Sequence, residues 1–121
     1  MKKFIAISVI LIFSSCHSFN QLSFDEDLAT KINLQYKTEK KPIDLTEITD
    51  FEWDNYIAIG CYQIPEQVEK KYNIDLSNIS EYATANDSNS LLVFIKNKKS
   101  IKICDVKHGT EFSEKKLLKV K

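Results

Sequence analysis

The sequence predicts a small α+β domain in which one or two helices pack on one face of an antiparallel sheet. Two segments, 24–36 and 64–72, carry an apolar residue every four positions, which is the spacing of one helix face. Segment 56–62 is rich in β-branched and aromatic residues and has the length of a strand. Segment 91–106 contains two such runs on either side of polar residues 97–99, which indicates a β-hairpin.

The first helix is predicted to begin at Ser23. A serine followed three residues later by a glutamate, here Glu26, forms a capping box, which satisfies free backbone N–H groups at a helix start. From Lys31 onward the apolar residues also alternate as they do in a strand, so a short helix that passes into extended chain fits both patterns. The apolar stripe consists of Phe24, Leu28, Ile32 and Tyr36.

The middle of the chain predicts a loop at 38–42, and then a short strand or an irregular connection at 43–49. The run from Tyr56 to Tyr62 is predicted to be the central strand of the sheet. Before it stands Asp50-Phe51-Glu52-Trp53-Asp54, and here the chain resembles small bacterial lipoproteins that carry an Asp-Phe-x-Trp-Asp segment before a hydrophobic strand. This resemblance implies no activity.

The second helix is predicted to start at Pro65, because proline suits the first turn of a helix, and to end at Asn73. The two strands of the hairpin follow, and His108-Gly109-Thr110 predicts another turn. The remaining apolar residues, from Phe112 to the end of the chain, fit either a short helix or an edge strand.

The first sixteen residues have the order of a secretory signal. Lys2 and Lys3 are basic, residues 4–13 are apolar or small, and Ser14-Ser15-Cys16 follows. The apolar run is too short to span a bilayer as a helix, which needs roughly 18 residues. The segment Phe13-Ser14-Ser15-Cys16 resembles the lipobox of bacterial lipoproteins. That resemblance implies cleavage before Cys16, followed by attachment of diacylglycerol and of an acyl chain such as palmitate to this cysteine. The alternative is that Cys16 is an ordinary cysteine behind a conventional cleavage site.

These features divide the chain into a signal peptide (1–15), a tether (16–22) and a single domain (23–121). Two or three acyl chains hold a protein at a membrane effectively permanently. We therefore expect a lipid-anchored protein of the cell membrane or the outer membrane that faces the periplasm. Its partners would be the membrane, through the anchor at Cys16, and an envelope protein.

Acidic and basic residues are unevenly distributed. Residues 16–95 include fourteen carboxylates and six lysines, whereas residues 96–121 include nine lysines and three carboxylates. The basic segment fits either an anionic partner or a pair of strands whose lysines protect the sheet edges. The chain has no arginine, so the usual bidentate contacts to guanine and phosphate are missing. Nucleic acid is therefore not an expected partner.

Few residues of the domain could carry chemistry. Cys61 and Cys104 either form a disulfide in an oxidising compartment or are two buried thiols. No metal site is predicted, because Asp50, Glu52 and Asp54 alternate as in a calcium loop but the glycine and glutamate that the loop also needs are absent; only a weak surface site remains as an alternative. Zinc-site spacings and glycine-rich phosphate loops are missing too, and no cofactor is expected.

We therefore expect a non-catalytic binding or interaction module of the cell envelope. The alternative is a small envelope thiol enzyme or hydrolase in which Cys61 or Cys104 acts with His108. Phe51 and Trp53 are expected in the core or as a lid, and not as a platform for a sugar. The predicted core consists of Phe24, Leu28, Trp53, Ile57, Ile59, Val68, Tyr72, Leu92, Phe94, Ile101 and Ile103.

Overall fold

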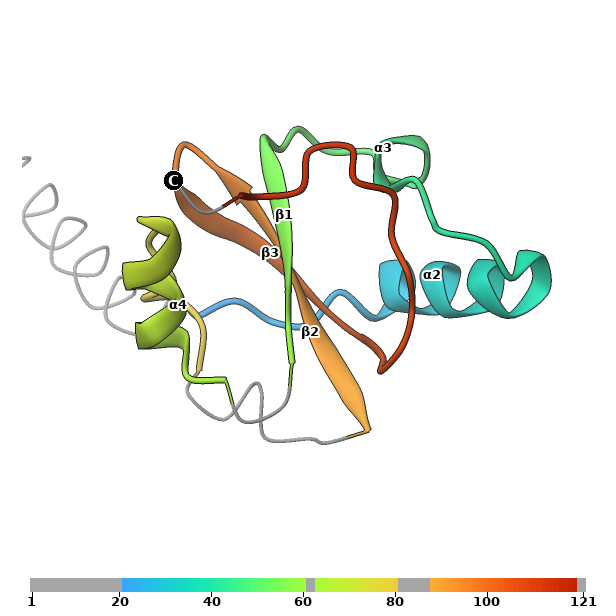
Figure 1. Cartoon of the computed structure of the whole chain (residues 1–121), viewed down its shortest axis with the longest axis horizontal. Helices are drawn as coiled ribbons and strands as arrows, with labels where there is room; N and C mark the ends of the chain where they lie inside the picture. The colour runs from blue at the N-terminus through green and yellow to red at the C-terminus, as the bar shows by residue number, and fades with distance from the viewer. Residues whose placement is uncertain (1–20, 61–62, 81–87, 120–121) are drawn as a thin grey trace, which may run out of the picture.

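The computed structural model describes residues 21–60, 63–80 and 88–119, in which three helices and three strands form a small α+β structure (Figure 1). The predicted signal peptide, the lipobox with Cys16, and Cys61 lie outside these residues. In chain order the elements are α2 (Glu26–Glu39), α3 (Leu45–Ile48), β1 (Asn55–Ile59), α4 (Pro65–Tyr72), β2 (Asn89–Lys96) and β3 (Lys99–Lys107). The predicted fold class is confirmed.

The three strands form one antiparallel sheet in the order β1-β2-β3. The predicted hairpin joins β2 to β3 through a two-residue turn, Asn97-Lys98. Both turn residues have positive φ, 53° and 63°, which is the backbone of a type I′ turn and matches the natural twist of a hairpin. The register shifts next to Ile95, which pairs with Ser100, so Ile101 is an extra residue in β3.

The central strand is β2, and the prediction that Tyr56–Tyr62 would be central is wrong. β1 lies at the edge of the sheet and ends at Ile59. Its outer edge is covered by the C-terminal segment, because the Tyr56 N–H donates to the Lys116 carbonyl at 3.0 Å and the Leu118 N–H donates to the Tyr56 carbonyl at 2.9 Å. The C-terminal segment therefore reaches the outer edge of β1 through a turn at 114–117 and an isolated bridge between Leu117 and Tyr56. Its described residues form neither the short helix nor the edge strand that the sequence left open.

Both faces of the sheet are covered by apolar clusters. Successive side chains of β2 point to opposite faces and contribute to both clusters. Leu92 and Phe94 belong to an apolar cluster that includes Leu28 of α2. Leu91 and Val93 belong to a second cluster that includes Val68 of α4. The helices α2 and α4 thus lie on opposite faces of the sheet, not on one face as predicted (Figure 1).

Helix α2 begins two residues later than predicted. Asp25 is its N-cap, and the Asp25 carboxylate accepts a hydrogen bond from the Leu28 N–H at 3.0 Å. Ser23 is not the cap, because the preceding residues are held extended: Phe24 bridges to Ile103 of β3, and the Asp25 N–H donates to the Ile103 carbonyl. The helix continues to Glu39, so the alternative of a strand from Lys31 is wrong.

The connection after α2 contains one short bridge and one helical turn. Ile43 pairs with Phe112, and α3 follows with Asp44 as its N-cap. The predicted limits of α4 are confirmed, since Pro65 occupies the first turn and Asn73 ends the helix in the left-handed region with φ of 57°. The predicted turn after β3 is also confirmed, with Gly109 at φ of 90°.

Most of the predicted core is buried. Three residues differ: Phe24 is 42% exposed, and Tyr72 and Ile101 are only half-buried, Ile101 because it is the extra residue in β3. Among the described residues, no helix has both the length and the apolar character needed to cross a membrane. The buried predicted residues are Leu28, Trp53, Ile57, Ile59, Val68, Leu92, Phe94 and Ile103.

Candidate functional site

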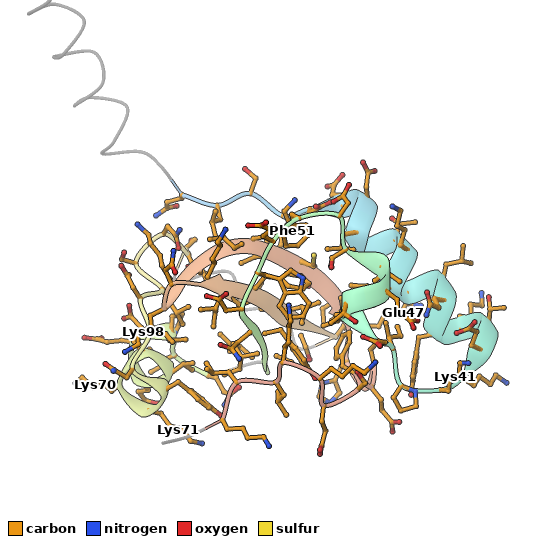
Figure 2. The ribbon with its side chains drawn as sticks, turned by 90° about the horizontal axis from the view of Figure 1, so that it is seen from above. Lys41, Glu47, Phe51, Lys70, Lys71 and Lys98 are labelled. Carbon is orange, nitrogen blue, oxygen red and sulfur yellow. The ribbon has the colours of Figure 1, made fainter. Side chains whose placement is uncertain are left out.

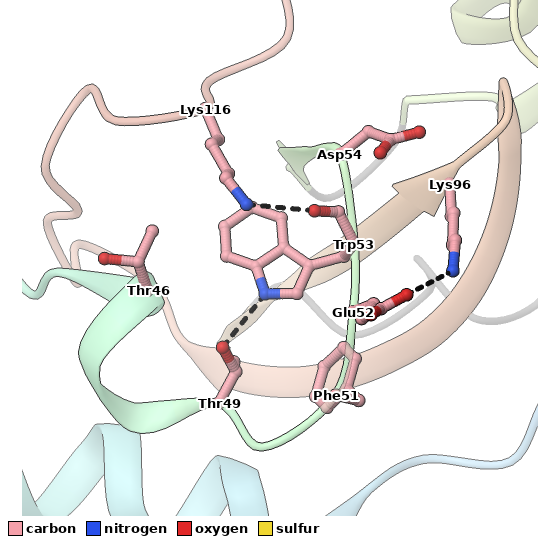
Figure 3. A pocket seen from close by; sticks show the side chains of 8 residues that line it. All are labelled: Thr46, Thr49, Phe51, Glu52, Trp53, Asp54, Lys96 and Lys116. Atoms are coloured by element: carbon pink, nitrogen blue, oxygen red, sulfur yellow. Dashed lines mark hydrogen bonds and ion pairs between the residues drawn. The ribbon is translucent and has the colours of Figure 1, made fainter.

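The Asp50–Asp54 segment borders an open pocket of about 380 Å³ (Figure 3). The pocket lies where α3, the approach to β1, the end of β2 and the C-terminal segment meet. Its lining residues are Thr46, Thr49, Phe51, Glu52, Trp53, Asp54, Lys96 and Lys116.

Trp53 forms the floor of this pocket and is only 5% exposed. Its indole N–H donates a hydrogen bond to the Thr49 hydroxyl oxygen at 2.9 Å (Figure 3). That hydroxyl donates in turn to the Leu45 carbonyl at 2.9 Å. The last turn of α3 therefore fixes the indole, and the buried N–H is satisfied as a buried donor must be. With so little of its surface accessible, Trp53 is a core residue, as predicted, and cannot serve as a stacking platform.

An aromatic cluster lies beneath the pocket and connects it to the sheet. The rings of Phe51 and Trp53 both meet Phe94 of β2 edge-on, with centroids 5.1 and 5.0 Å apart. Tyr56 and Phe112 continue the cluster, with their centroids 5.8 Å apart. Edge-to-face pairs of this kind contribute about 0.5–1.5 kcal/mol each beyond the area they bury. The approach to β1 is thus held against the middle of the sheet.

Lys116 closes one side of the pocket. Its ammonium lies 4.7 Å from the centre of the Trp53 ring, which is a cation–π contact, and donates to the Trp53 carbonyl at 3.1 Å (Figure 3). Lys116 itself has a positive φ of 61°. A neighbouring residue, Lys115, forms an ion pair with Asp44 at 2.7 Å. The C-terminal segment is therefore fastened to the start of α3 and to β1 by side chains as well as by backbone hydrogen bonds.

Two acidic residues of the segment, Glu52 and Asp54, have structural partners. Glu52 forms an ion pair with Lys96 at 2.9 Å, and the hydrogen bond from Lys96 lowers the pKa of the Glu52 carboxyl and raises that of Lys96. The Asp54 carboxylate accepts a hydrogen bond from the Asn97 N–H in the hairpin turn at 2.8 Å. Within the described ranges, no group of three or more metal-ligating side chains is close enough to hold an ion. Glu52 and Asp54 thus fasten the approach to β1 to the end of β2 and to the hairpin turn.

The structure describes one of the two cysteines proposed as a nucleophile or a disulfide partner. Cys104 lies on β3 with no exposed surface, and burial raises the pKa of its thiol to about 12. A thiol in this environment is neither accessible nor ionised near neutral pH. Cys61 lies outside the described residues, so its pairing with Cys104 stays a prediction.

His108, the predicted partner of a nucleophile, lies in the exposed turn after β3. Its Nδ1 is 3.4 Å from the Ser90 hydroxyl oxygen.

No protein-family model, curated protein or solved structure matches this chain. The chemistry of the described residues is therefore the basis for a functional proposal.

Four lining residues escaped the sequence analysis, namely Thr46, Thr49, Lys96 and Lys116. Thr49 precedes Trp53 by four positions, a spacing that says little outside a helix. Lys116 lies 63 positions beyond the carbonyl it binds, and no local pattern could reveal that contact. The pocket contains two hydroxyls, two ammonium groups and two carboxylates, most of them bonded to one another or to the backbone. These contacts hold α3, the approach to β1, the end of β2 and the C-terminal segment together around the pocket.

Proposed function

We propose that this protein is a lipid-anchored lipoprotein of the bacterial cell envelope whose domain is a non-catalytic binding or interaction module. The observation that carries the proposal is the order of basic, apolar and small residues that ends at Cys16. The start of the folded domain supports it, because the Leu22 N–H donates to the Asn78 carbonyl at 2.8 Å and the Leu22 side chain packs against the second apolar cluster. The predicted tether, 16–22, would connect such an anchor to the domain, except that Leu22 at its end already packs against the domain.

The non-catalytic part of the proposal is supported by the state of Cys104. A thiol enzyme needs an accessible thiolate beside a base, whereas Cys104 is fully buried with its pKa raised by that burial. The alternative function therefore depends on Cys61 acting with His108.

The proposed location is the periplasmic side of the cell membrane or of the outer membrane. The membrane would be the first partner, through the acyl chains on Cys16, and an envelope protein the second. Because two or three chains make anchoring effectively permanent, binding by the domain would be confined to a layer next to the membrane.

Replacement of Cys16 by serine tests the anchor. In bacteria that express the full chain, Cys16→Ser should move the protein from the membrane fraction to the soluble fraction, or leave an uncleaved precursor. Cys61→Ser is the matched control, since it makes the same chemical change in the domain and should leave the protein in the membrane. Unchanged detergent partitioning and unchanged electrophoretic mobility of the Cys16→Ser protein would contradict the proposal.

Alkylation separates the binding module from the thiol enzyme. The folded, non-reduced protein is treated with iodoacetamide near neutral pH, and the modified cysteines are located by mass spectrometry. We expect Cys104 to stay unmodified and Cys61 to show no reaction that depends on histidine. Rapid labelling of Cys61 that is lost in His108→Ala would favour the thiol enzyme.

A further inference from the structure

A cavity of about 310 Å³ lies between the C-terminal half of α2 and the turn that follows β3. The two segments are joined by a hydrogen bond from the Lys107 N–H to the side-chain oxygen of Asn33 at 3.2 Å. Helix α2 lies on the far side of the domain from α4 (Figure 1). The lining residues of the cavity are Asn33, Tyr36, Lys37, Lys107, His108, Gly109 and Thr110.

The charge of this cavity is unbalanced. Lys37 and Lys107 line it, and no carboxylate does. Neither ammonium group forms an ion pair with a described residue, because the three ion pairs of the described chain use other lysines. The nearest carboxylate along β3, that of Asp105, accepts a hydrogen bond from Asn89. A concave surface with two cations and no counter-charge raises the local concentration of anions.

Neutral donors at the same place complement the two lysines. The Asn33 side chain uses its oxygen to accept from Lys107, which leaves its NH₂ group without a partner among the described residues. The Tyr36 hydroxyl is likewise without a hydrogen bond to any described residue. His108 has one ring nitrogen near Ser90 and the other one open. At Gly109 a side chain would meet nothing within 4 Å, so the turn leaves open space beside these donors.

The opposite half of α2 shows the reverse charge. A second cavity of about 360 Å³, near the N-terminus of the helix, is lined by Asp25, Glu26 and Asp105 and by no lysine. Asn33 lines both cavities. Asp25 is paired with Lys102, but Glu26 and Asp105 form no ion pair with a described residue, so their charges disfavour an anion at that end of α2 while Lys37 and Lys107 favour one at the other end.

We infer that the cavity between α2 and the β3 turn is a binding site for the phosphate group of a ligand. A phosphate presents three or more acceptor oxygens, and the two ammonium groups, the Asn33 amide and the Tyr36 hydroxyl supply donors from several directions. The half-buried Tyr36 ring offers an apolar wall for the part of the ligand that carries the phosphate. This inference gives the proposed binding module a class of ligand. It rests on the proposed function in one respect, that the domain binds its ligand without catalysing a reaction.

Titration with inorganic phosphate tests the site. The full-length protein, labelled with ¹⁵N and purified in a mild non-ionic detergent, is titrated at constant ionic strength while amide NMR spectra are recorded. Saturable shifts are expected at the amides of Lys107, Gly109 and Thr110. Lys107→Gln and Lys37→Gln should each weaken binding about tenfold, because each removes a charge-assisted hydrogen bond.

The matched control is Lys70→Gln, which removes an exposed lysine of α4 and should leave the affinity for phosphate unchanged (Figure 2). The inference is overturned if the shifts do not saturate, if they fall elsewhere, or if the Lys107 and Lys37 variants bind as tightly as the parent. Well-dispersed spectra of the variants show that they are folded. If Cys16→Ser left the protein in the membrane fraction, the anchor proposal would fail while the phosphate titration would keep its meaning, so the two proposals fail separately.

Vesicles distinguish the source of the phosphate. Binding to phosphatidylcholine vesicles with and without phosphatidic acid is compared for the parent protein and Lys107→Gln. If the headgroup is the ligand, phosphatidic acid should strengthen binding of the parent and have a much smaller effect on the variant. An equal effect on both proteins, together with saturable binding of free phosphate, assigns the site to a soluble phosphorylated compound.

Discussion

Replacement of Asp25 separates the two contributions that hold the start of α2. The Asp25 carboxylate caps the helix through the Leu28 N–H and also forms an ion pair with Lys102 of β3 at 2.9 Å, in a half-buried position. Loss of a cap costs about 1 kcal/mol, and an ion pair of this kind contributes up to about 1 kcal/mol. Asp25→Ala should therefore lower the free energy of unfolding by about 1.5–2 kcal/mol.

Two further variants make this prediction specific. Asp25→Asn keeps an oxygen that can cap the helix but loses the charge, so it should cost only about 0.5 kcal/mol. Ser23→Ala should change stability by less than about 0.5 kcal/mol, because Ser23 is exposed and is not the cap. Urea unfolding followed by the fluorescence of Trp53, the single tryptophan, measures all three. With a slope of about 1.5 kcal/mol per molar urea, Asp25→Ala should move the midpoint by about 1 M.

The pH dependence of the same variants provides a second measurement. The hydrogen bond from the Leu28 N–H, followed by that from Lys102, lowers the pKa of Asp25 below its usual value. A carboxyl with a lowered pKa contributes stability that is fully present above its unfolded-state pKa and is lost as the pH falls through its folded-state pKa. The difference between the parent and Asp25→Asn should therefore shrink below about pH 4. A larger loss in Ser23→Ala than in Asp25→Ala would refute this account of the helix start.

Three other predictions concern the sheet. Phe94→Ala should lower the free energy of unfolding by about 3–5 kcal/mol, because Phe94 is fully buried under two aromatic rings. Ile101→Ala should lower it clearly less, because Ile101 is only half-buried, and equal losses in urea unfolding would contradict the assigned register. Lys98→Gly should stabilise the protein by about 0.5–1 kcal/mol, because residue 98 has a positive φ that glycine adopts without strain; a lower thermal midpoint would show that the turn differs. Cys104→Ser should lower the free energy of unfolding by about 1–3 kcal/mol more than Cys104→Ala, because the serine buries a hydroxyl in an apolar cluster. A lower unfolding midpoint for Cys104→Ala than for Cys104→Ser would place residue 104 at the surface.

Elements whose signals are local could be predicted from the sequence. The limits of α4 follow from Pro65 and Asn73, and the hairpin follows from two β-rich runs around Asn97-Lys98. The burial of Trp53 was predicted as well, although its hydrogen bond to Thr49 was not. In each case the residues that decide the structure are neighbours in the chain.

Features that depend on distant contacts could not be predicted. The start of α2 moved from Ser23 to Asp25 because β3, almost eighty positions later, holds Phe24 in an extended conformation. Hydrophobicity made Tyr56–Tyr62 look central, but strand order depends on pairing, and β2 pairs on both sides. The candidate phosphate site brings Lys37 and Lys107 together from two elements, which charge patterns along the chain do not reveal.

The mass of the mature N-terminal peptide tests the central claim of a lipid anchor most directly. The protein is expressed as the full chain, extracted from membranes with detergent and digested, and the N-terminal peptide is analysed by mass spectrometry. Our account predicts a peptide that begins at Cys16 and carries the added mass of diacylglycerol and an amide-linked acyl chain. An N-terminal peptide that begins elsewhere, or one that begins at Cys16 with an unmodified thiol, would contradict the account.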